Sequence, residues 1–353
     1  MSVQQVPASE AATDLSRFDA VIDARSPSEF AEDHLPGAVN WPVLDDEQRR
    51  IVGTLYKQVG PLEARKVGAA MVARNIAGHV EQWVQDKPRD WRPLVYCWRG
   101  GQRSGSMAWF LGQIGFRATQ LAGGYKGFRA VVRDELGRLP STLRLTVLAG
   151  RTGSGKTRLL QALATEGAQV LDLEALACHR GSILGGLPDT PQPTQKRFDS
   201  LVWQALRAFD ASRPVFVESE SKRIGRLQVP DALLERMRGD ARVLRVQMPD
   251  AARVRLLLED YGFFARDPAR FCALLEALVE LQGHATVSRW QAMAGAGQWA
   301  AVFGELMLRH YDPLYERSMR SHFAALADAP TVDIDDGSPE AMRDAARRLT
   351  TAA

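Results

Sequence analysis

Short apolar runs alternate with helical patterns along the first 140 residues. The runs with the composition of buried strands cover residues 19–26, 37–43, 94–98 and 118–124. Apolar positions at helical spacing cover residues 61–84 and 104–114. A helix is also expected to start at Ser26-Pro27-Ser28-Glu29, a capping box with proline at the first helical position. Strands that alternate with helices predict a parallel α/β domain.

The same alternation resumes where "DELGRLPSTLRL" ends one helical pattern, offers a Pro-Ser turn near residue 140 and starts a new apolar strand. Strands are predicted at residues 143–149, 168–173, 214–218, 242–248 and 331–334, and helices at 156–165 and 195–210. A largely helical section covers residues 250–322, and a last helix follows the final strand. We therefore expect two α/β domains, residues 1–140 and 141–353, the second with a helical insertion at about 250–322.

The composition is that of a globular protein, because 45% of the 353 residues are apolar and 25% are charged. No apolar run approaches the roughly 20 residues that cross a bilayer, and the N-terminal segment is polar, so we predict a cytoplasmic protein without membrane contact. Cys97, Cys178 and Cys272 form no C-x-x-C pair, and the histidines have no metal-ligand spacing. We therefore expect neither a disulfide framework nor a metal site from these residues.

The net charge of +3 gives no polyelectrolyte argument for nucleic acid binding by the whole chain. The balance differs locally, because residues 222–255 hold nine Lys or Arg against four acidic residues. Two interpretations of this segment stay open: a solvated basic face, or a surface that binds phosphate.

The segment "GRTGSGKT", residues 150–157, fits the phosphate-binding pattern G-x-x-x-x-G-K-[ST] and lies between a predicted strand and a predicted helix. Its glycines let the backbone curl into an anion nest beside the positive end of the helix. Lys156 offers a charge for terminal phosphates, and the Thr157 hydroxyl suits a Mg²⁺ ion. The residues expected to bind a diphosphate or nucleotide are Gly150, Gly153, Ser154, Gly155, Lys156 and Thr157.

Acidic residues follow two of the predicted strands in the second domain. Where a nucleotide hydrolase places a metal-binding aspartate, this chain has "PVFVESES", with Glu218 and Glu220. Glu218 holds a metal through water or has a structural role, and both interpretations stay open. Asp172 and Glu174 follow the other strand, near where small-molecule kinases hold their acceptor. Diphosphate or triphosphate binding is therefore better supported than hydrolysis of ATP.

The segment "VYCWRGGQRSGS", residues 95–106, places Cys97 at the end of a strand, before a tight turn that two glycines permit. The N–H groups of the loop and the dipole of the next helix converge on the sulfur, and Arg99 and Arg103 add positive charge. Each effect favours the thiolate over the thiol. The same loop would hold a transferred anionic group such as phosphate, selenophosphate or sulfane sulfur. We predict that Cys97, Arg99 and Arg103 are catalytic and that the other two cysteines are inert.

The segments "DARSPSEF", "HLPGAVNWP", "YCWRGGQRS" and "LAGGYKGFR" resemble the successive signature segments of a rhodanese domain. One feature departs from the sulfurtransferases of that family: their loop usually closes with six residues, whereas Cys97 and Arg103 are spaced as C-x5-R. The longer loop is similar to that of the phosphatase relatives of rhodanese. This departure implies room for a larger tetrahedral anion.

A rhodanese domain followed directly by a P-loop domain, with "HYDPLY" at residues 310–315, resembles the tRNA 2-selenouridine synthase family. The resemblance implies that the substrates are selenophosphate, geranyl diphosphate and a tRNA with 2-thiouridine at the wobble position. It implies that the sulfur is first geranylated and then displaced by selenium. No tightly bound cofactor is implied, and Mg²⁺ is compatible with the phosphate loop.

The resemblance also suggests how the candidate residues divide the work. Lys156 and its loop would bind the diphosphate of geranyl diphosphate, with Asp172 and Glu218 behind them. Cys97 would serve the selenium step, either through a covalent adduct or by positioning the anion. Lys222, Arg223 and Arg226 are candidates for tRNA backbone contacts. The apolar "YGFF" at residues 261–264 either lines a prenyl channel or packs in the core.

Two other functions remain as alternatives. A bifunctional enzyme would combine a C-x5-R phosphatase or sulfurtransferase with a P-loop small-molecule kinase, and it would hydrolyse p-nitrophenyl phosphate. A non-catalytic RNA-binding regulator gated by nucleotide would tolerate the loss of the Cys97 thiol.

Overall fold

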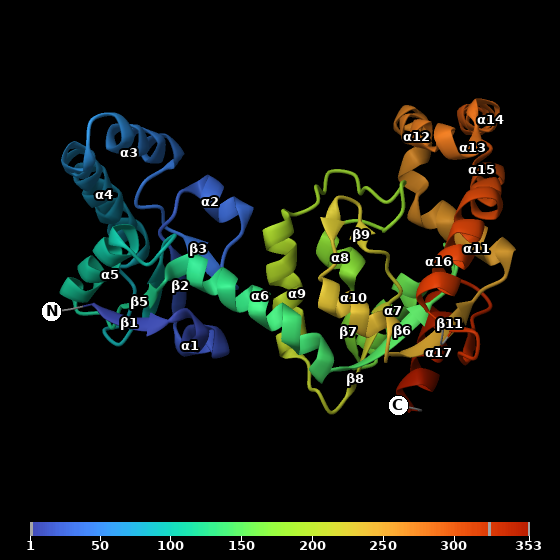
Figure 1. Cartoon of the computed structure of the whole chain (residues 1–353), viewed down its shortest axis with the longest axis horizontal. Helices are drawn as coiled ribbons and strands as arrows, with labels where there is room; N and C mark the ends of the chain where they lie inside the picture. Colours follow the sequence, from blue (N-terminus) through green and yellow to red (C-terminus); the bar gives the residue numbers. More distant parts are fainter. Residues whose placement is uncertain (1–2, 324–325, 352–353) are drawn as a thin grey trace. The chain divides into compact units, whose positions relative to one another are not determined.

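Over residues 3–323 and 326–351, which this computed structural model describes, the chain forms two parallel sheets in two compact units (Figure 1). The first unit contains the chain up to Glu135 and the segment Thr194–Gln204. The second contains Leu136–Pro193 and the chain from Ala205 onward. Parallel strands connected through helices confirm the α/β class predicted for both parts.

The sheet of the first unit places the loop after β4 at its centre. Its strands are β1 (Gln4–Pro7), β2 (Ala20–Asp23), β3 (Ala38–Asn40), β4 (Pro93–Tyr96) and β5 (Thr119–Ala122). They lie in the order β1-β5-β4-β2-β3, and each neighbouring pair is parallel. The chain therefore leaves β4 from the middle of the carboxyl edge, where parallel α/β sheets place their binding sites.

The helices of the first unit cover this sheet. They are α1 (Ala8–Thr13), α2 (Pro27–Glu32), α3 (Asp46–Gln58), α4 (Pro61–Trp83), α5 (Gln102–Ile114) and α6 (Gly124–Thr142), with a 3₁₀ turn at Leu15–Arg17. The predicted capping box is present, because Ser26 and Glu29 each bond the backbone N–H of the other at the start of α2. Helices α3 and α4 lie side by side (Figure 1).

Alternation along β4 decides which way the sulfur of Cys97 points. Val95 and Cys97 belong to the apolar cluster that includes Met107 and Leu111 of α5 and Ile76 of α4. Because successive strand residues face opposite sides of a sheet, Tyr96 points to the other face. The sulfur therefore lies on the side covered by α5, the helix that follows its loop.

Helix α9 (Gln195–Ala208) begins in the first unit, where a buried carboxylate holds it. Asp33 is fully buried, and its Oδ2 accepts hydrogen bonds from Tyr125 Oη and Ser200 Oγ, both at 2.9 Å. Arg129 Nη1 also donates to Ser200 Oγ, at 2.9 Å. Burial raises the pKa of Asp33, although both hydroxyl bonds and the Arg129 charge act in the opposite direction.

The second unit repeats the parallel arrangement. Its strands are β6 (Arg144–Ala149), β7 (Gln169–Leu171), β8 (Pro214–Glu218), β11 (Arg242–Gln247) and β12 (Thr331–Asp333), in the order β12-β11-β6-β8-β7. A short antiparallel pair, β9 (Arg223–Ile224) and β10 (Leu227–Gln228), follows β8. β6 is central, so the phosphate-loop segment leaves the middle of the carboxyl edge, flanked by the ends of β8 and β11.

The helices of the second unit divide into two groups. Packed around the sheet are α7 (Lys156–Thr165), α8 (Leu173–Ala177), α10 (Asp231–Arg238), α11 (Asp250–Asp260) and α17 (Pro339–Thr351). The helical section continues with α12 (Pro268–Leu275), α13 (Val279–Gln282), α14 (His284–Gly295), α15 (Trp299–Leu306) and α16 (Asp312–His322). It has a core of its own around Phe271, Trp290 and Phe303. Within the described residues, no helix combines the length and apolar character needed to cross a membrane.

Three features differ from the sequence-based expectation. Helix α6 continues through Pro140 to Thr142, so the expected turn is absent at this position; a proline in the last turn removes one backbone donor and leaves the earlier turns intact. Helices α3 and α10 were not predicted, although both are amphipathic, and neither was the short strand β1. The segment Thr194–Gln204, expected in the second domain, clusters with the first unit.

The buried Asp33 gives a test of how α9 is held. Replacing it with Ala leaves the buried hydroxyls of Tyr125 and Ser200 without their acceptor, while Arg129 keeps its ion pair with Asp199 at 2.8 Å, so we expect the free energy of unfolding to fall by about 2–4 kcal/mol. Urea denaturation of the full chain measures this change. Asp86 is exposed, and Asp86→Ala should change stability by no more than about 0.5 kcal/mol. Equal losses in the two variants would contradict the assigned role of Asp33.

Candidate functional site

The cysteine loop lies between the end of β4 and the start of α5. Cys97 is 3% exposed, with apolar side chains behind it and a cavity of about 540 Å³ in front of its loop. Its Sγ accepts a hydrogen bond from the hydroxyl of Ser104, at 3.1 Å. The sulfur is therefore at the boundary between the core and the cavity, with a fixed polar neighbour from the first turn of α5.

Close backbone packing holds the loop in shape. Gly100 and Gly124 have φ values of +66° and +54°. A Cβ atom on Gly124 would lie 2.3 Å from the carbonyl oxygen of Cys97, and one on Gly100 would lie 2.5 Å from that of Leu121. Tyr125 N donates to the same Cys97 oxygen at 2.8 Å. The Gly-Gly pair of "LAGGYKGFR" is thus the support on which the cysteine loop rests.

The carbonyl groups of the loop are turned away from the cavity by one side chain. Gln120 Nε2 donates to the carbonyl oxygens of Gly100 and Gly101, at 2.8 and 3.0 Å, and to Ser104 Oγ at 2.9 Å. Among the described residues, none accepts a hydrogen bond from the backbone N–H groups of residues 98–103. With its oxygens bound and its N–H groups free, the loop is suited to receive an anion.

Three arginines line the cavity in front of Cys97. Arg99 and Arg103 were expected there, and Arg49 of α3 joins them. Arg103 is engaged, because its Nη1 lies 2.6 Å from Glu29 Oε2. Burial raises the pKa of Glu29, and the hydrogen bond and charge of Arg103 more than offset this, so the pKa is lowered overall. Arg49 and Arg99 are exposed and supply the accessible positive charge.

The phosphate loop of the second unit has the strained glycines that its pattern predicts. Gly153 and Gly155 have φ values of +76° and +82°. A Cβ atom on Gly150 would lie 2.7 Å from the carbonyl oxygen of Val246, so only glycine fits beside β11. In the described chain, the N–H groups of residues 152, 153 and 155–157 have no protein acceptor. They border a cavity of about 400 Å³.

Lys156 and Thr157 make different contacts at this loop's opening. Lys156 Nζ donates to the carbonyl oxygen of Gly150 at 2.7 Å, so the lysine side chain folds back onto the first residue of the phosphate loop. Thr157 Oγ1 lies 3.2 Å from Glu218 Oε2 and 3.4 Å from Glu174 Oε2. The threonine therefore connects the phosphate loop to a group of acidic side chains.

Three glutamates form this acidic group, which we call the glutamate cluster: Glu174, Glu218 and Glu220, with one oxygen of each within 4.8 Å of the others. Burial, followed by the charge of Glu220, raises the pKa of Glu174 from its usual 4.5 to about 8. Burial and neighbouring carboxylates also raise the pKa values of Glu218 and Glu220. Glu218 is 1% exposed, and its Oε1 has no partner among the described residues. Carboxylate oxygens beside a threonine hydroxyl fit a Mg²⁺ ion.

The other predicted residues lie outside this cluster or carry contacts of their own. Asp172 is the N-cap of α8, accepting from Ala175 N at 2.8 Å, and burial raises its pKa. Lys222 lies 3.5 Å from Asp231, and Arg226 Nη2 donates to the carbonyl oxygen of Gln192 at 2.6 Å. Arg223 is exposed on the β9–β10 hairpin.

The segment 261–264 supports the packing interpretation more than a channel. Phe264 is fully buried in the core of the helical section, and Tyr261 stacks on it, with ring centroids 6.1 Å apart. Tyr261 also borders the phosphate-loop cavity, where the guanidinium of Arg180 lies 5.0 Å from its ring.

Several residues of these sites were missed by the sequence analysis. Arg49 comes from a helix that had not been predicted, and Gln120 lies on a strand with no chemical signature. Glu174 and Glu220 were noticed only as members of separate segments. The order β6-β8-β7 brings their strand ends together, and a sequence-based strand order would have been the signal to find them.

The support of the cysteine loop can be tested with two glycines of α6. In Gly124→Ala, the added Cβ would lie too close to the carbonyl oxygen of Cys97, and the alanine would have to adopt the positive φ of this position. We therefore expect a loss of about 1–3 kcal/mol in the free energy of unfolding. Gly137→Ala is the matched control, because a Cβ there meets nothing within 4 Å and the residue is helical. It should stabilise the protein by up to about 1 kcal/mol. Similar denaturation midpoints for the two variants would argue against the close packing.

The glutamate cluster predicts an unusual dependence of stability on pH. With a pKa near 8 in the folded protein and 4.5 in the unfolded chain, Glu174 keeps a proton that the unfolded chain has lost. The free energy of unfolding should therefore fall as the pH rises from about 5 to 8. Glu174→Gln should make this slope shallower in urea titrations without divalent cations, and part of the slope should remain because the pKa values of Glu218 and Glu220 are also raised.

The control for that titration is Glu280→Gln, an exposed glutamate, which should keep the slope of the parent protein. Added Mg²⁺ should also flatten the parent's slope, because it binds the deprotonated carboxylates. A parent slope that Glu174→Gln leaves unchanged would contradict the assigned burial of this carboxyl group.

Known proteins resemble the chain over both units. A family model described as a tRNA 2-selenouridine synthase AAA domain matches residues 143–277, and one described as a rhodanese-like domain matches residues 7–131. The tRNA 2-selenouridine synthase of Nitrosomonas europaea is 39% identical over 245 residues, which are 68% of this chain and 63% of that protein. The chain thus spans less than two thirds of that relative's length.

Another relative is matched more completely. The tRNA 2-selenouridine synthase of Aeromonas salmonicida is 32% identical over 327 residues, which are 84% of this chain and 86% of that protein. Among solved structures, a rhodanese-related protein from Thermoplasma volcanium is 16% identical over 36% of this chain and 92% of that chain, with a TM-score of 0.24 that supports no argument. The sequence similarity across both units shows that this chain belongs to the tRNA 2-selenouridine synthase family.

Proposed function

We propose that the chain is a transferase that converts 2-thiouridine at the wobble position of tRNA into 2-selenouridine, with geranyl diphosphate and selenophosphate as the other substrates. The observation that carries the proposal is the presence of two anion-binding loops, one with a cysteine and one with a lysine, in a chain of this family. Because its substrate is tRNA, we expect it to act in the cytoplasm.

The first reaction would use the phosphate loop. The sulfur of 2-thiouridine attacks C1 of geranyl diphosphate and forms a C–S bond, while the C1–O bond breaks and its electron pair leaves with the diphosphate. The proton on N3 of the base is released. The N–H groups of the loop and Lys156 would stabilise the charge of the departing diphosphate, which is the largest electrostatic demand of this step.

The glutamate cluster would support this reaction as a holder for Mg²⁺. Glu174, Glu218 and Glu220 with the Thr157 hydroxyl are the residues that would bind the ion. When bound, Mg²⁺ supplies charge that stabilises diphosphate. The cluster contacts Thr157, and Lys156 lies near enough for its charge to act on all three glutamates, so that the ion and the ammonium group would act on the same leaving group.

The second reaction would use the cysteine loop. Selenium of selenophosphate adds to C2 of the geranylated base, the C–S bond breaks, and geranyl thiol leaves. Water cleaves the Se–P bond, which releases phosphate and leaves the selenium on C2. The free N–H groups of residues 98–103, with Arg49 and Arg99, would hold the phosphate part of the donor. The Cys97 sulfur at the rear of this cavity would contact the selenium, covalently or by positioning it.

Two substitutions should separate the reactions. Cys97→Ser should abolish formation of 2-selenouridine and leave S-geranyl-2-thiouridine to accumulate, because the phosphate loop is intact. Lys156→Ala should weaken binding of geranyl diphosphate by roughly ten- to a hundredfold, the value of a charged hydrogen bond, and reduce both products. Mass spectrometry of nucleosides from tRNA incubated with each substrate, alone and together, measures this.

The matched control is Cys178→Ser, a cysteine remote from both loops in sequence, which should leave both products at the parent level. If Cys97→Ser protein still produces 2-selenouridine at the parent rate, the role given to Cys97 is wrong. If Lys156→Ala protein binds geranyl diphosphate as tightly as the parent, the diphosphate assignment is wrong.

A further inference from the structure

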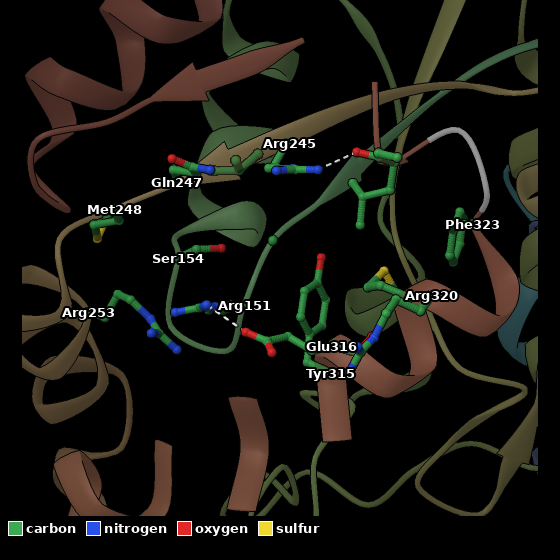
Figure 2. A pocket seen from close by; sticks show the side chains of 15 residues that line it. Arg151, Ser154, Arg245, Gln247, Met248, Arg253, Tyr315, Glu316, Arg320 and Phe323 are labelled. Atoms are coloured by element: carbon green, nitrogen blue, oxygen red, sulfur yellow. Dashed lines mark hydrogen bonds and ion pairs between the residues drawn. The ribbon is translucent and has the colours of Figure 1, made fainter. Parts of the chain in front are cut away.

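A second cavity adjoins the phosphate loop, and neither sequence motif accounts for it. It has a volume of about 650 Å³ and lies on the side of the loop marked by Gly150, Arg151 and Ser154 (Figure 2). We call it the chamber. Its other walls come from the end of β11 and from α16 with the residues that follow this helix.

The chamber and the phosphate-loop cavity share a wall. Tyr315 and Met319 of α16 line both of them. Gly150, Arg151 and Ser154 border the chamber, while Gly153, Gly155 and Lys156 of the same loop border the other cavity. A ligand whose anionic end occupies the loop can therefore extend its remaining part past Tyr315 and Met319 into the chamber.

Apolar side chains form much of the chamber wall. Met248, Met319, Phe323 and Leu326 contribute apolar side chains, and the first three are buried. In Figure 2, Phe323 lies on the side of the chamber away from the loop, and Met248 lies near the loop. Apolar walls extend along the chamber, which suits a flexible hydrocarbon chain more than a compact polar ring system.

The arginines that border the chamber are largely engaged by the protein. Arg253 is 1% exposed, and its Nη1 donates to Asp250 and Asp312, at 2.8 and 2.9 Å. Arg151 Nη2 donates to Glu316 at 2.6 Å, and Arg245 donates to the carbonyl oxygen of Leu326 (Figure 2). Arg320 Nε donates to the carbonyl oxygen of Glu316 at 3.3 Å, and among the described residues neither Arg320 nor Arg245 has a carboxylate partner, so the chamber keeps positive charge beside its apolar wall.

Two hydroxyl groups in the chamber lack a partner. Ser154 is 1% exposed, and neither its Oγ nor the Oη of Tyr315 has a hydrogen-bond partner among the described residues. Figure 2 shows both hydroxyl groups on the side of the chamber formed by the loop and α16. A buried hydroxyl without a partner costs free energy, so this end of the chamber calls for a ligand with acceptor oxygens.

We propose that the chamber holds the hydrocarbon chain of an isoprenoid diphosphate, and that Met319 and Phe323 set the chain length it accepts. The inference rests on the proposed function, which places the diphosphate in the phosphate loop. Oxygens at the diphosphate end accept hydrogen bonds from Ser154 and Tyr315, and the chain extends along Met319 toward Phe323. Each methylene group buried in this way strengthens binding about fourfold.

The main test places a larger side chain in the chamber. Met319→Trp should raise the Kd of geranyl diphosphate by about tenfold or more beyond any change in the Kd of inorganic diphosphate, as expected if a few methylene groups are displaced; the comparison is needed because Met319 also lines the phosphate-loop cavity. Isothermal titration calorimetry with the full chain measures both, and the inorganic diphosphate titration reports that the loop is folded. Arg317→Trp is the matched control, an exposed residue of α16 that lines neither cavity, and should change neither Kd.

Two further measurements do not depend on the folding of that variant. The parent protein should bind geranyl diphosphate with a more negative heat capacity change than inorganic diphosphate, because only the former buries apolar surface. Phe323→Ala should enlarge the chamber and shift transfer toward farnesyl diphosphate, which has five more carbons, relative to geranyl diphosphate. Equal heat capacity changes for the two ligands, or an unchanged preference in Phe323→Ala, would overturn the assignment.

The outcomes separate this inference from the function on which it rests. If Met319→Trp binds geranyl diphosphate like the parent, the chamber is not the chain site, and the proposed function survives. If Met319→Trp instead loses affinity for tRNA alone, the chamber belongs to RNA, and the inference is overturned. If the parent protein binds inorganic diphosphate and shows no preference for geranyl diphosphate, both the inference and the geranylation step fail.

Discussion

Backbone N–H groups without an intramolecular acceptor, at a junction between a parallel strand and a helix, are the feature on which both candidate sites depend. Residues 98–103 after β4, and residues 152, 153 and 155–157 after β6, provide such groups in the two units. A parallel sheet places these junctions at one edge, and the following helix adds its positive end. The fold thus provides two groups of free N–H donors suited to an anion before any charged side chain is considered.

Keeping those N–H groups free requires contacts elsewhere in each unit. In the first unit, Gln120 binds the loop's carbonyl oxygens, and Gly124 lets the backbone of α6 approach the Cys97 carbonyl. In the second, Gly150 lets the loop pass against β11. The reactive or charged side chains, Cys97 and Lys156, therefore depend on residues that take no part in the chemistry themselves, namely two glycines and the amide of Gln120. The glutamate cluster adds a buried negative region beside the second nest, and its raised pKa values show how strongly the fold concentrates acidic groups there.

Contiguous features of these sites could be predicted from sequence, and contacts between distant segments could not. The phosphate loop is one uninterrupted sequence pattern, and Cys97 and Arg103 belong to one loop. Their proximity could therefore be predicted from the sequence. Arg49 reaches the cysteine cavity from α3, whose position is set by packing against α4 rather than by local sequence. Arg103 was expected to face the anion, and its ion pair with Glu29 depends on where α2 lies. Most strands and several helices followed from periodicity, whereas the helix through Pro140 did not, because neighbouring turns outweigh one lost donor.

The course of the chain between the units has a consequence for how the protein is made. It leaves the first unit after Glu135, returns at Thr194 and leaves again after Gln204. The carboxylate of Asp33 therefore finds Ser200 only when a segment far downstream has been synthesised. When only the first 140 residues have left the ribosome, the first unit still exposes the apolar surface that α9 covers. Asp33 then lacks the hydroxyl of Ser200 as a hydrogen-bond donor. Completion of the first unit during translation must wait for Thr194–Gln204, which is synthesised after β6, the phosphate loop and β7, so the first unit is completed only after the phosphate loop has been made.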